Sequence, residues 1–167
     1  QEPLIVAISF DLSGKAALVT GANTGIGQAI AVALAQAGAD VAVAGRSEPA
    51  ETLELLAKTG RKTLSIKADL SSTEPVNRII DETLAGLGRI DILVNNAGII
   101  RRNDLEAFTE DDWDAVVDTN LKTLFFLSQA AARHMMAQGS GKIVNIASLL
   151  SFQGGIRVPS YAAAKSG

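Results

Sequence analysis

The sequence predicts an α/β fold, a doubly wound parallel sheet with helices on both faces. Short, almost wholly apolar runs of strand length alternate with longer stretches of helical periodicity, the pattern of parallel strands that are buried on both faces. A glycine-rich turn separates the first apolar run from the helix that follows it. Together these observations predict a Rossmann-type domain.

The first half of the chain carries clear boundary signals. Gly38 and Gly60 follow helical patterns, where glycine favours the left-handed conformation that ends a helix. Pro49 suits the opening of a helix, because its missing N–H needs no partner there. The elements expected in this half are strands over 16–20 and 41–44 and helices over about 26–36 and 49–58.

The second half repeats the alternation. Ser71 and Ser72 offer capping hydroxyls for one helix, and Thr109 with Asp112 forms a capping-box-like start to another. The helical pattern that starts at Thr109 is expected to break near Thr119. The elements expected here are strands over 64–68, 91–95 and 143–147 and helices over about 71–84 and 109–137.

Composition limits the class of protein. The 167 residues, 47% apolar and 20% charged, predict one globular domain over 1–167 with no repeat or linker. The net charge of −3 without a basic stripe argues against nucleic acid as a partner, and no apolar run is long enough to suggest a membrane span. The absence of cysteine fits a cytoplasmic protein. With one histidine, we expect no metal site.

Both ends of the chain carry an expectation. The sequence stops at Gly167, where a sixth helix is expected to begin, so an edge strand would be left uncovered. We therefore expect a C-terminal part to be missing. The apolar segment from Leu4 to Ile8 is either an ordered extra arm or a poorly ordered tail. Glu2 precedes it and no basic residue does, so a secretory signal is not expected.

The glycine turn runs Thr20-Gly21-Ala22-Asn23-Thr24-Gly25-Ile26-Gly27 between a strand and a helix. Gly21 allows a tight turn, Gly25 lets the backbone approach a pyrophosphate, and Gly27 lets the helix pack closely on the strand. The helix N-terminus favours bound phosphate. A dinucleotide-binding turn is the functional interpretation, and a glycine turn without a ligand is the alternative.

Further polar residues come directly after predicted strands, where doubly wound folds bind ligands. Asn95-Asn96-Ala97-Gly98 closes the fourth strand and serves either the site or an ordinary turn. Asp69 and Leu70 follow the third strand, where a cap or turn role is the simpler alternative.

A second group of residues suggests proton chemistry. Tyr161 and Lys165 are four residues apart on one helix face. A phenol is a weak base at neutral pH, and a cation fixed beside it favours the phenolate. Ser148 ends the fifth strand, where a serine is usually a cap, and Asn120 lies near the helix break. Each residue alone has an ordinary structural explanation.

In this order, the motifs from Phe10 to Gly167 resemble the short-chain dehydrogenase/reductase family. The resemblance implies an NAD(P)-dependent oxidoreductase that transfers hydride between nicotinamide and a hydroxyl or keto carbon. It implies that Tyr161 is the general acid/base, that Lys165 supports it and holds the nicotinamide ribose, and that Ser148 contacts the substrate oxygen. Asn120 would position a water for proton relay. The resemblance also implies a homotetramer formed through the long helices.

The resemblance also implies which residues hold the cofactor: Gly21, Asn23, Thr24, Gly25, Ile26, Gly27, Arg46, Asp69, Leu70, Asn96, Ala97, Gly98, Tyr161 and Lys165. The second strand ends at Gly45-Arg46 without a carboxylate that would select NAD. Arg46 either meets a ribose 2′-phosphate or is a surface arginine, and Glu48 lies close by. These residues favour NADP slightly.

Two segments that border the substrate end resemble the sugar-acid branch of the family, which includes gluconate dehydrogenases. They are 99–103 and 151–159, and their polar candidates for recognising a carboxylate are Arg102, Gln153 and Arg157, beside Ser148 and Tyr161. In the alternative interpretation, each arginine pairs with Asp104 or Glu106 or faces solvent. Two other functions stay open: a 3-oxoacyl carrier-protein reductase of the same family, and a nonenzymatic dinucleotide-binding module.

Overall fold

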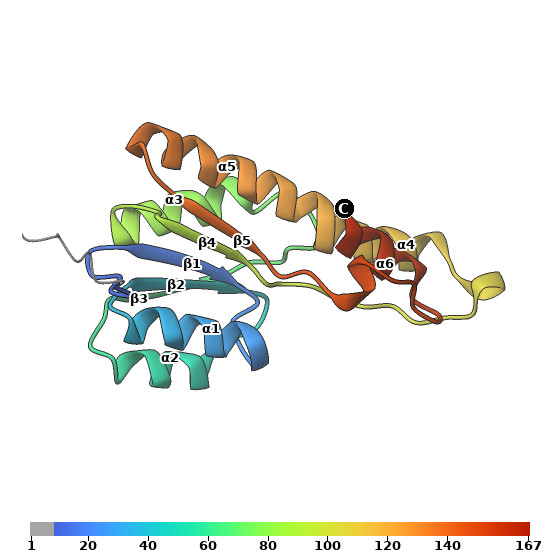
Figure 1. The fold of residues 1–167 in the computed structure, drawn as a ribbon, viewed down its shortest axis with the longest axis horizontal. Helices are drawn as coiled ribbons and strands as arrows, with labels where there is room; N and C mark the ends of the chain where they lie inside the picture. Colours follow the sequence, from blue (N-terminus) through green and yellow to red (C-terminus); the bar gives the residue numbers. More distant parts are fainter. Residues whose placement is uncertain (1–8) are drawn as a thin grey trace, which may run out of the picture.

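Five parallel strands form the centre of the computed structural model, which describes residues 9–167 (Figure 1). The apolar segment from Leu4 to Ile8 lies outside the described residues. The strands are β1 (Ala16–Thr20), β2 (Asp40–Gly45), β3 (Thr63–Lys67), β4 (Ile92–Asn95) and β5 (Lys142–Asn145). Their order in the sheet is β3-β2-β1-β4-β5. The predicted doubly wound parallel sheet is therefore confirmed.

The strand order creates a place for a ligand. β1 pairs with β2 on one side, where Val19 faces Val43, and with β4 on the other, where Val19 faces Val94. The chain builds outward from β1 to β3 and then crosses over to β4 and β5. Doubly wound sheets leave a crevice at this switch point, outside the carboxyl ends of the strands.

Helices cover both faces of the sheet (Figure 1). One face carries α1 (Gly25–Gln36) and α2 (Ala50–Ala57), and the other carries α3 (Val76–Leu87) and α5 (Thr123–Gln138). Beyond the carboxyl ends of the strands lie α4 (Glu110–Val117) and α6 (Pro159–Ser166). Two 3-10 turns, η1 (Leu105–Ala107) and η3 (Leu149–Ser151), and a π-helical turn, η2 (Asp118–Lys122), complete the structure.

Small and aliphatic side chains fill the core. All five residues of β1 are buried, as a central strand covered on both faces requires. Ala31 and Ala35 are the buried contacts of α1 together with Gly27, so this helix approaches the sheet closely. The aromatic residues Trp113, Phe125 and Phe126 lie outside this core and are exposed.

Several sequence-based boundaries are confirmed. Gly38 and Gly60 follow their helices with positive φ. The Thr109 hydroxyl accepts a hydrogen bond from Asp112 N–H (3.1 Å) and caps α4. The break expected near Thr119 is the π-helical turn between α4 and α5.

Two expectations about helix starts were wrong. Ser71 and Ser72 do not cap α3, which begins later, at Val76, with Pro75 at its N-cap position. Proline fixes its own φ near the helical value, and the residues before it form turns instead. The sixth helix does not begin at the end of the chain, because α6 already starts at Pro159.

β5 is an edge strand of the sheet. Its Ile143 and Val144 side chains are exposed, in contrast to those of β1 and β2. Among residues 9–167, no helix combines the length and apolar character needed to cross a bilayer.

Candidate active site

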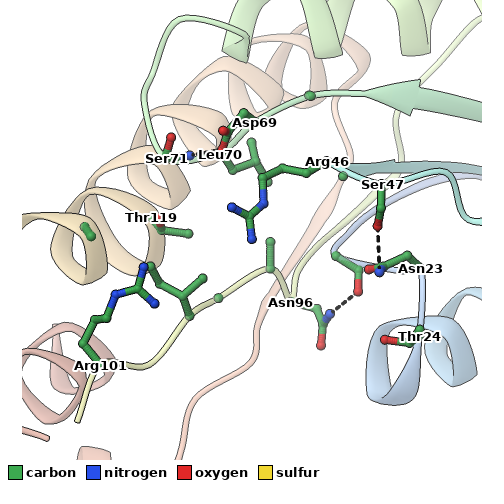
Figure 2. Close-up of a pocket in the computed structure, with 17 residues that line it drawn as sticks. Asn23, Thr24, Arg46, Ser47, Asp69, Leu70, Ser71, Asn96, Arg101 and Thr119 are labelled. Atoms are coloured by element: carbon green, nitrogen blue, oxygen red, sulfur yellow. Dashed lines mark hydrogen bonds between the residues drawn. The ribbon is translucent and has the colours of Figure 1, made fainter. Parts of the chain in front are cut away.

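A cleft of about 360 Å³ opens at the carboxyl ends of β1 to β4, at the switch point of the sheet (Figure 2). Its walls are the glycine turn, the segments after β2 and β3, the segment after β4, and the region around η2. The predicted cofactor residues that line it are Gly21, Asn23, Thr24, Arg46, Asp69, Leu70, Asn96, Ala97 and Gly98. One cavity thus brings together residues from five separate parts of the chain.

The remaining predicted cofactor residues lie outside the lining of this cleft. Gly25 and Ile26 begin α1 and are exposed, whereas Gly27 is buried beneath the turn. Tyr161 and Lys165 belong to α6. Their contact with a cofactor stays a prediction.

The glycine turn needs its glycines for two different reasons. Gly21 has φ +64, and a Cβ there would stand 2.8 Å from the Ala97 backbone. Gly25 has φ +59, but a Cβ would meet nothing within 4 Å, so only its conformation calls for glycine. The N-cap residue of α1, Thr24, makes no side-chain capping hydrogen bond. The first N–H groups of α1 are therefore not satisfied by that side chain, as at a phosphate-binding helix start.

Asn96 ties the glycine turn to β4. Its side-chain Nδ2 donates to the carbonyl oxygens of Thr20 and Gly21, both at 3.0 Å. The Thr20 hydroxyl in turn accepts from the backbone N–H groups of Asn96 (3.1 Å) and Ala97 (3.0 Å). Asn95 links neighbouring strands, donating to Asn145 Oδ1 and to Ser128 Oγ, both at 2.9 Å. The paired asparagines therefore hold the cleft in shape.

Arg46 and Asp69 face the cleft from two adjacent strand ends. The Arg46 guanidinium points into the cavity (Figure 2) and forms no ion pair within residues 9–167. Asp69 Oδ1 accepts from Ser71 N–H at 3.0 Å. That hydrogen bond lowers the pKa of Asp69, burial opposes the shift, and the Arg46 charge adds to it. Asp69 thus has both a turn role and a place in the cleft, and it stays ionised at neutral pH.

Asn120 lies on the π-helical turn η2 and is buried. Its Oδ1 accepts from Ile99 N–H, and its Nδ2 donates to Ile99 C=O, both at 2.8 Å. This pair of bonds fixes the segment after β4 against the turn. The side-chain amide is therefore committed to Ile99, and the predicted helix irregularity is present at the same residue.

Ser148, Tyr161 and Lys165 lie at the end of the sheet beyond β5. Lys165 Nζ donates to the carbonyl oxygen of Ile146 (2.6 Å), just after β5, and stands 5.8 Å from the centre of the Tyr161 ring. The tyrosine and the lysine thus share one side of α6, as their spacing predicted. Burial lowers the pKa of Lys165. Ser148 Oγ accepts from Leu150 N–H (3.2 Å) and caps η3, so the serine has the capping role that the sequence left open.

The predicted substrate residues lie on exposed segments. Arg157 Nε pairs with Asp104 Oδ1 at 2.9 Å, which is the alternative considered for this arginine, and its backbone has φ +64. Arg102 and Gln153 are exposed. None of these three residues is among those that line the cleft. Their recognition of a substrate stays a prediction.

The model of the short chain dehydrogenase family matches residues 15–167. This chain belongs to that family. This chain is 54% identical over 164 residues to the 2-dehydro-3-deoxy-D-gluconate 5-dehydrogenase of Escherichia coli. The match spans 98% of this chain and 65% of that protein. It is 43% identical to the 3-oxoacyl-[acyl-carrier-protein] reductase of Staphylococcus aureus, spanning 92% of this chain and 63% of that protein.

A solved structure shares the fold closely. The crystal structure from Agrobacterium tumefaciens described as a 2-deoxy-d-gluconate 3-dehydrogenase, with bound NADP, is 56% identical and has a TM-score of 0.85. The match covers 96% of this chain and 64% of that one. The chain therefore spans just under two thirds of the length of these relatives.

Some residues that line the cleft of this chain were not among the predicted cofactor residues. Those next to predicted ones at strand ends or in the segment after β4 are Gly45, Ser47, Ala68, Ser71, Ile99 and Arg101. Selecting the four residues that follow each parallel strand would have found Ser47, Ala68, Ser71 and Ile99. Ala115 and Thr119 come from α4 and η2. A break was expected near Thr119, but no local pattern places these two residues in the cleft, because only the packing of η2 against the β4 segment brings them there.

Proposed function

We propose that this chain is the dinucleotide-binding and catalytic part of an NAD(P)-dependent oxidoreductase acting on a hydroxyl or keto carbon of a sugar acid. The observation that carries the proposal is the placement of two sites at one end of the sheet. A cleft built on the glycine turn lies at the ends of β1 to β4, and Tyr161 with Lys165 lies beyond β5. Family membership supports the same activity.

The cleft fits a dinucleotide. The glycine turn leaves no room for a Cβ on the β4 side at Gly21, and the α1 N-terminus beside it suits a pyrophosphate. Asp69 would contact the adenine. Arg46 points into the cleft without an acidic partner among the described residues, which suits a 2′-phosphate. We therefore favour NADP, in keeping with the NADP bound in the Agrobacterium tumefaciens structure.

The residues beyond β5 would move the proton. The bound nicotinamide supplies or accepts the hydride. In the oxidation direction Tyr161 takes the hydroxyl proton, and in the reduction direction it returns one. Lys165 favours the phenolate by its charge and would hold the nicotinamide ribose. Ser148 Oγ is the acceptor in its capping bond, so its hydrogen would be free to donate to the substrate oxygen.

Asn120 would contribute through its backbone. Its side-chain amide is committed to Ile99 in both directions. A π-helical turn interrupts the regular carbonyl ladder of the helix, so a main-chain carbonyl of η2 is the better holder of a relay water. The water would connect Lys165 to solvent.

The sugar-acid assignment has two supports. The Escherichia coli relative is named for a deoxygluconate substrate, and the segments 99–103 and 151–159 carry guanidinium and amide groups suited to a carboxylate. For Arg157 to bind a substrate carboxylate, that carboxylate would have to replace Asp104, whose side chain is itself exposed. Arg102 and Gln153 have no such competitor in the contacts of residues 9–167.

We further propose a cytoplasmic homotetramer. The exposed aromatic residues Trp113, Phe125 and Phe126 lie on or near the long helical segment from α4 to α5. Phe125 and Phe126 form an edge-to-face pair with ring centres 5.3 Å apart. An exposed aromatic pair of this kind suits contact between subunits.

A steady-state screen of the full-length protein tests the substrate class. We expect NADP-dependent oxidation of gluconate-type sugar acids and little reduction of 3-oxoacyl thioesters. Preferred turnover of the thioester would replace the sugar-acid assignment with the acyl reductase, whose Staphylococcus aureus relative is 43% identical. No turnover of either class, with intact NADP binding, would favour the nonenzymatic module.

A further inference from the structure

Thr52 is a fully buried polar residue on α2 that is not among the residues lining the cleft. Its hydroxyl donates to the carbonyl oxygen of Ala22, in the glycine turn, at 2.7 Å, with a longer contact of 3.3 Å to the Asn23 carbonyl. The same hydroxyl accepts from Gln28 Nε2 on α1 at 3.1 Å. Since a hydroxyl has one hydrogen, the 2.7 Å bond to Ala22 is the principal one.

Apart from these polar partners, α1 and α2 contribute apolar side chains to the core beside Thr52. Leu56, one turn further along α2, is fully buried, and α1 presents Ala31 to the same core. A valine would fill nearly the same volume as Thr52 without a polar group to desolvate. Helix packing alone therefore does not call for a hydroxyl at this position. We define the turn–helix bridge as Thr52, Gln28 and the Ala22 carbonyl that Thr52 holds.

The turn–helix bridge has a consequence for the cleft. Because the peptide is planar and trans, fixing the Ala22 carbonyl toward α2 turns the Asn23 N–H away from α2. Asn23 itself lines the cleft, and its Nδ2 donates to Ser47 Oγ at 3.0 Å (Figure 2). The turn–helix bridge therefore holds the Ala22–Asn23 peptide from the side of α2. Asn23 in turn contacts Ser47, the residue next to Arg46.

We propose that Thr52 is a positioning residue for the cofactor: it holds the glycine turn in the conformation that receives the dinucleotide phosphates. The inference rests on the proposed dinucleotide function. Thr52 touches no ligand and acts through the Ala22–Asn23 peptide. Cofactor affinity should therefore depend on the hydroxyl, while turnover at saturating cofactor should not.

The test compares matched variants of the full-length protein, using NADP as the probe. Thr52→Val removes only the hydroxyl, and Thr52→Ser keeps it. Thr83→Val is the control, because Thr83 is also fully buried and donates to a backbone carbonyl, that of Ile79 at 2.7 Å, but on α3. We expect Thr52→Val to raise the NADP Kd roughly tenfold, with kcat within about twofold of wild type. Thr52→Ser should restore the Kd to within about twofold.

The control separates positioning from general stability. Thr52→Val and Thr83→Val should lower the Tm by similar amounts, because each removes one buried hydrogen bond. Thr83→Val should leave the NADP Kd unchanged. A folded Thr52→Val protein with a wild-type Kd, or an equal rise in Kd for Thr83→Val, would overturn the proposal. If Thr52→Val does not fold, Thr52→Cys carries the same expectation, because a thiol is a weak donor. Absence of NADP binding by the wild type is a different result, which refutes the dinucleotide function itself.

Discussion

Replacing Gly27 with alanine should distort the glycine turn and lower the free energy of unfolding. A Cβ at this position would stand 2.4 Å from Asn96 Nδ2, 2.4 Å from the Gly21 carbonyl oxygen and 3.0 Å from Ala22 Cα. Moving the Asn96 amide breaks its two hydrogen bonds to Thr20 and Gly21, at about 1 kcal/mol each. Displacing the turn backbone adds about 1–3 kcal/mol, and the better helix propensity of alanine returns about 1 kcal/mol. The free energy of unfolding should fall by about 2–4 kcal/mol.

Urea unfolding followed by circular dichroism measures this loss. Since a domain is typically stable by about 5–15 kcal/mol, Gly27→Ala should remain folded, and its NADP Kd should rise because the turn has moved. Gly154→Ala is the matched control, since a Cβ there meets nothing within 4 Å and its φ is not positive. A stability loss below about 0.5 kcal/mol in Gly27→Ala, with an unchanged NADP Kd, would refute the close packing of the turn on Asn96.

Two other predictions concern charge. Arg46→Ala should raise the NADP Kd roughly tenfold or more and leave the NAD Kd nearly unchanged; calorimetry with both cofactors checks this, and equal losses would remove Arg46 from the 2′-phosphate site. Burial raises the pKa of Asp91, but hydrogen bonds from Arg89 and Ala16 N–H and the charges of Arg89 and Lys15 outweigh it, so the pKa lies below 3.8. The Asp91 carboxylate therefore stabilises the fold above about pH 4 and loses this effect as the pH falls through the lowered pKa. Asp91→Asn should cost about 1–3 kcal/mol near neutral pH and progressively less in acid, and a loss independent of pH in urea unfolding would contradict the ion pair.

Local signals were enough to predict the sheet and the turn. β1 spans Ala16–Thr20 as expected, because a fully buried strand is almost wholly apolar. Gly21 and Gly25 have the positive φ that a glycine turn implies. The break expected near Thr119 coincides with the polar run Asp118-Thr119-Asn120. Such features depend on residues close together in the sequence.

Features that depend on distant contacts were missed or left open. Ser71 and Ser72 were predicted to cap a helix. In the structure Ser71 N–H donates a hydrogen bond to Asp69 Oδ1, and α3 begins only after Pro75. The role of Thr52 arises only where α1, α2 and the turn meet. No sequence pattern reports such a meeting, because it depends on how helices separated by β2 pack together.

The same limit explains the substrate residues. Arg157 resembled a carboxylate ligand, and in the structure its guanidinium pairs with Asp104. The sequence shows which arginines are near the site but not which acid each one selects. Side-chain pairing on exposed segments depends on small differences in free energy, of about 0–1 kcal/mol.

Turnover and cofactor binding measured together in Tyr161→Phe test the central claim most directly. Phenylalanine keeps the ring next to Lys165 and removes only the hydroxyl that would carry the proton. With NADP and the best sugar acid, we predict that kcat falls by about 10²–10⁴-fold or to the detection limit, while the NADP Kd changes by less than about threefold. Turnover at the wild-type rate in this variant would contradict the assignment of Tyr161 as the general acid/base.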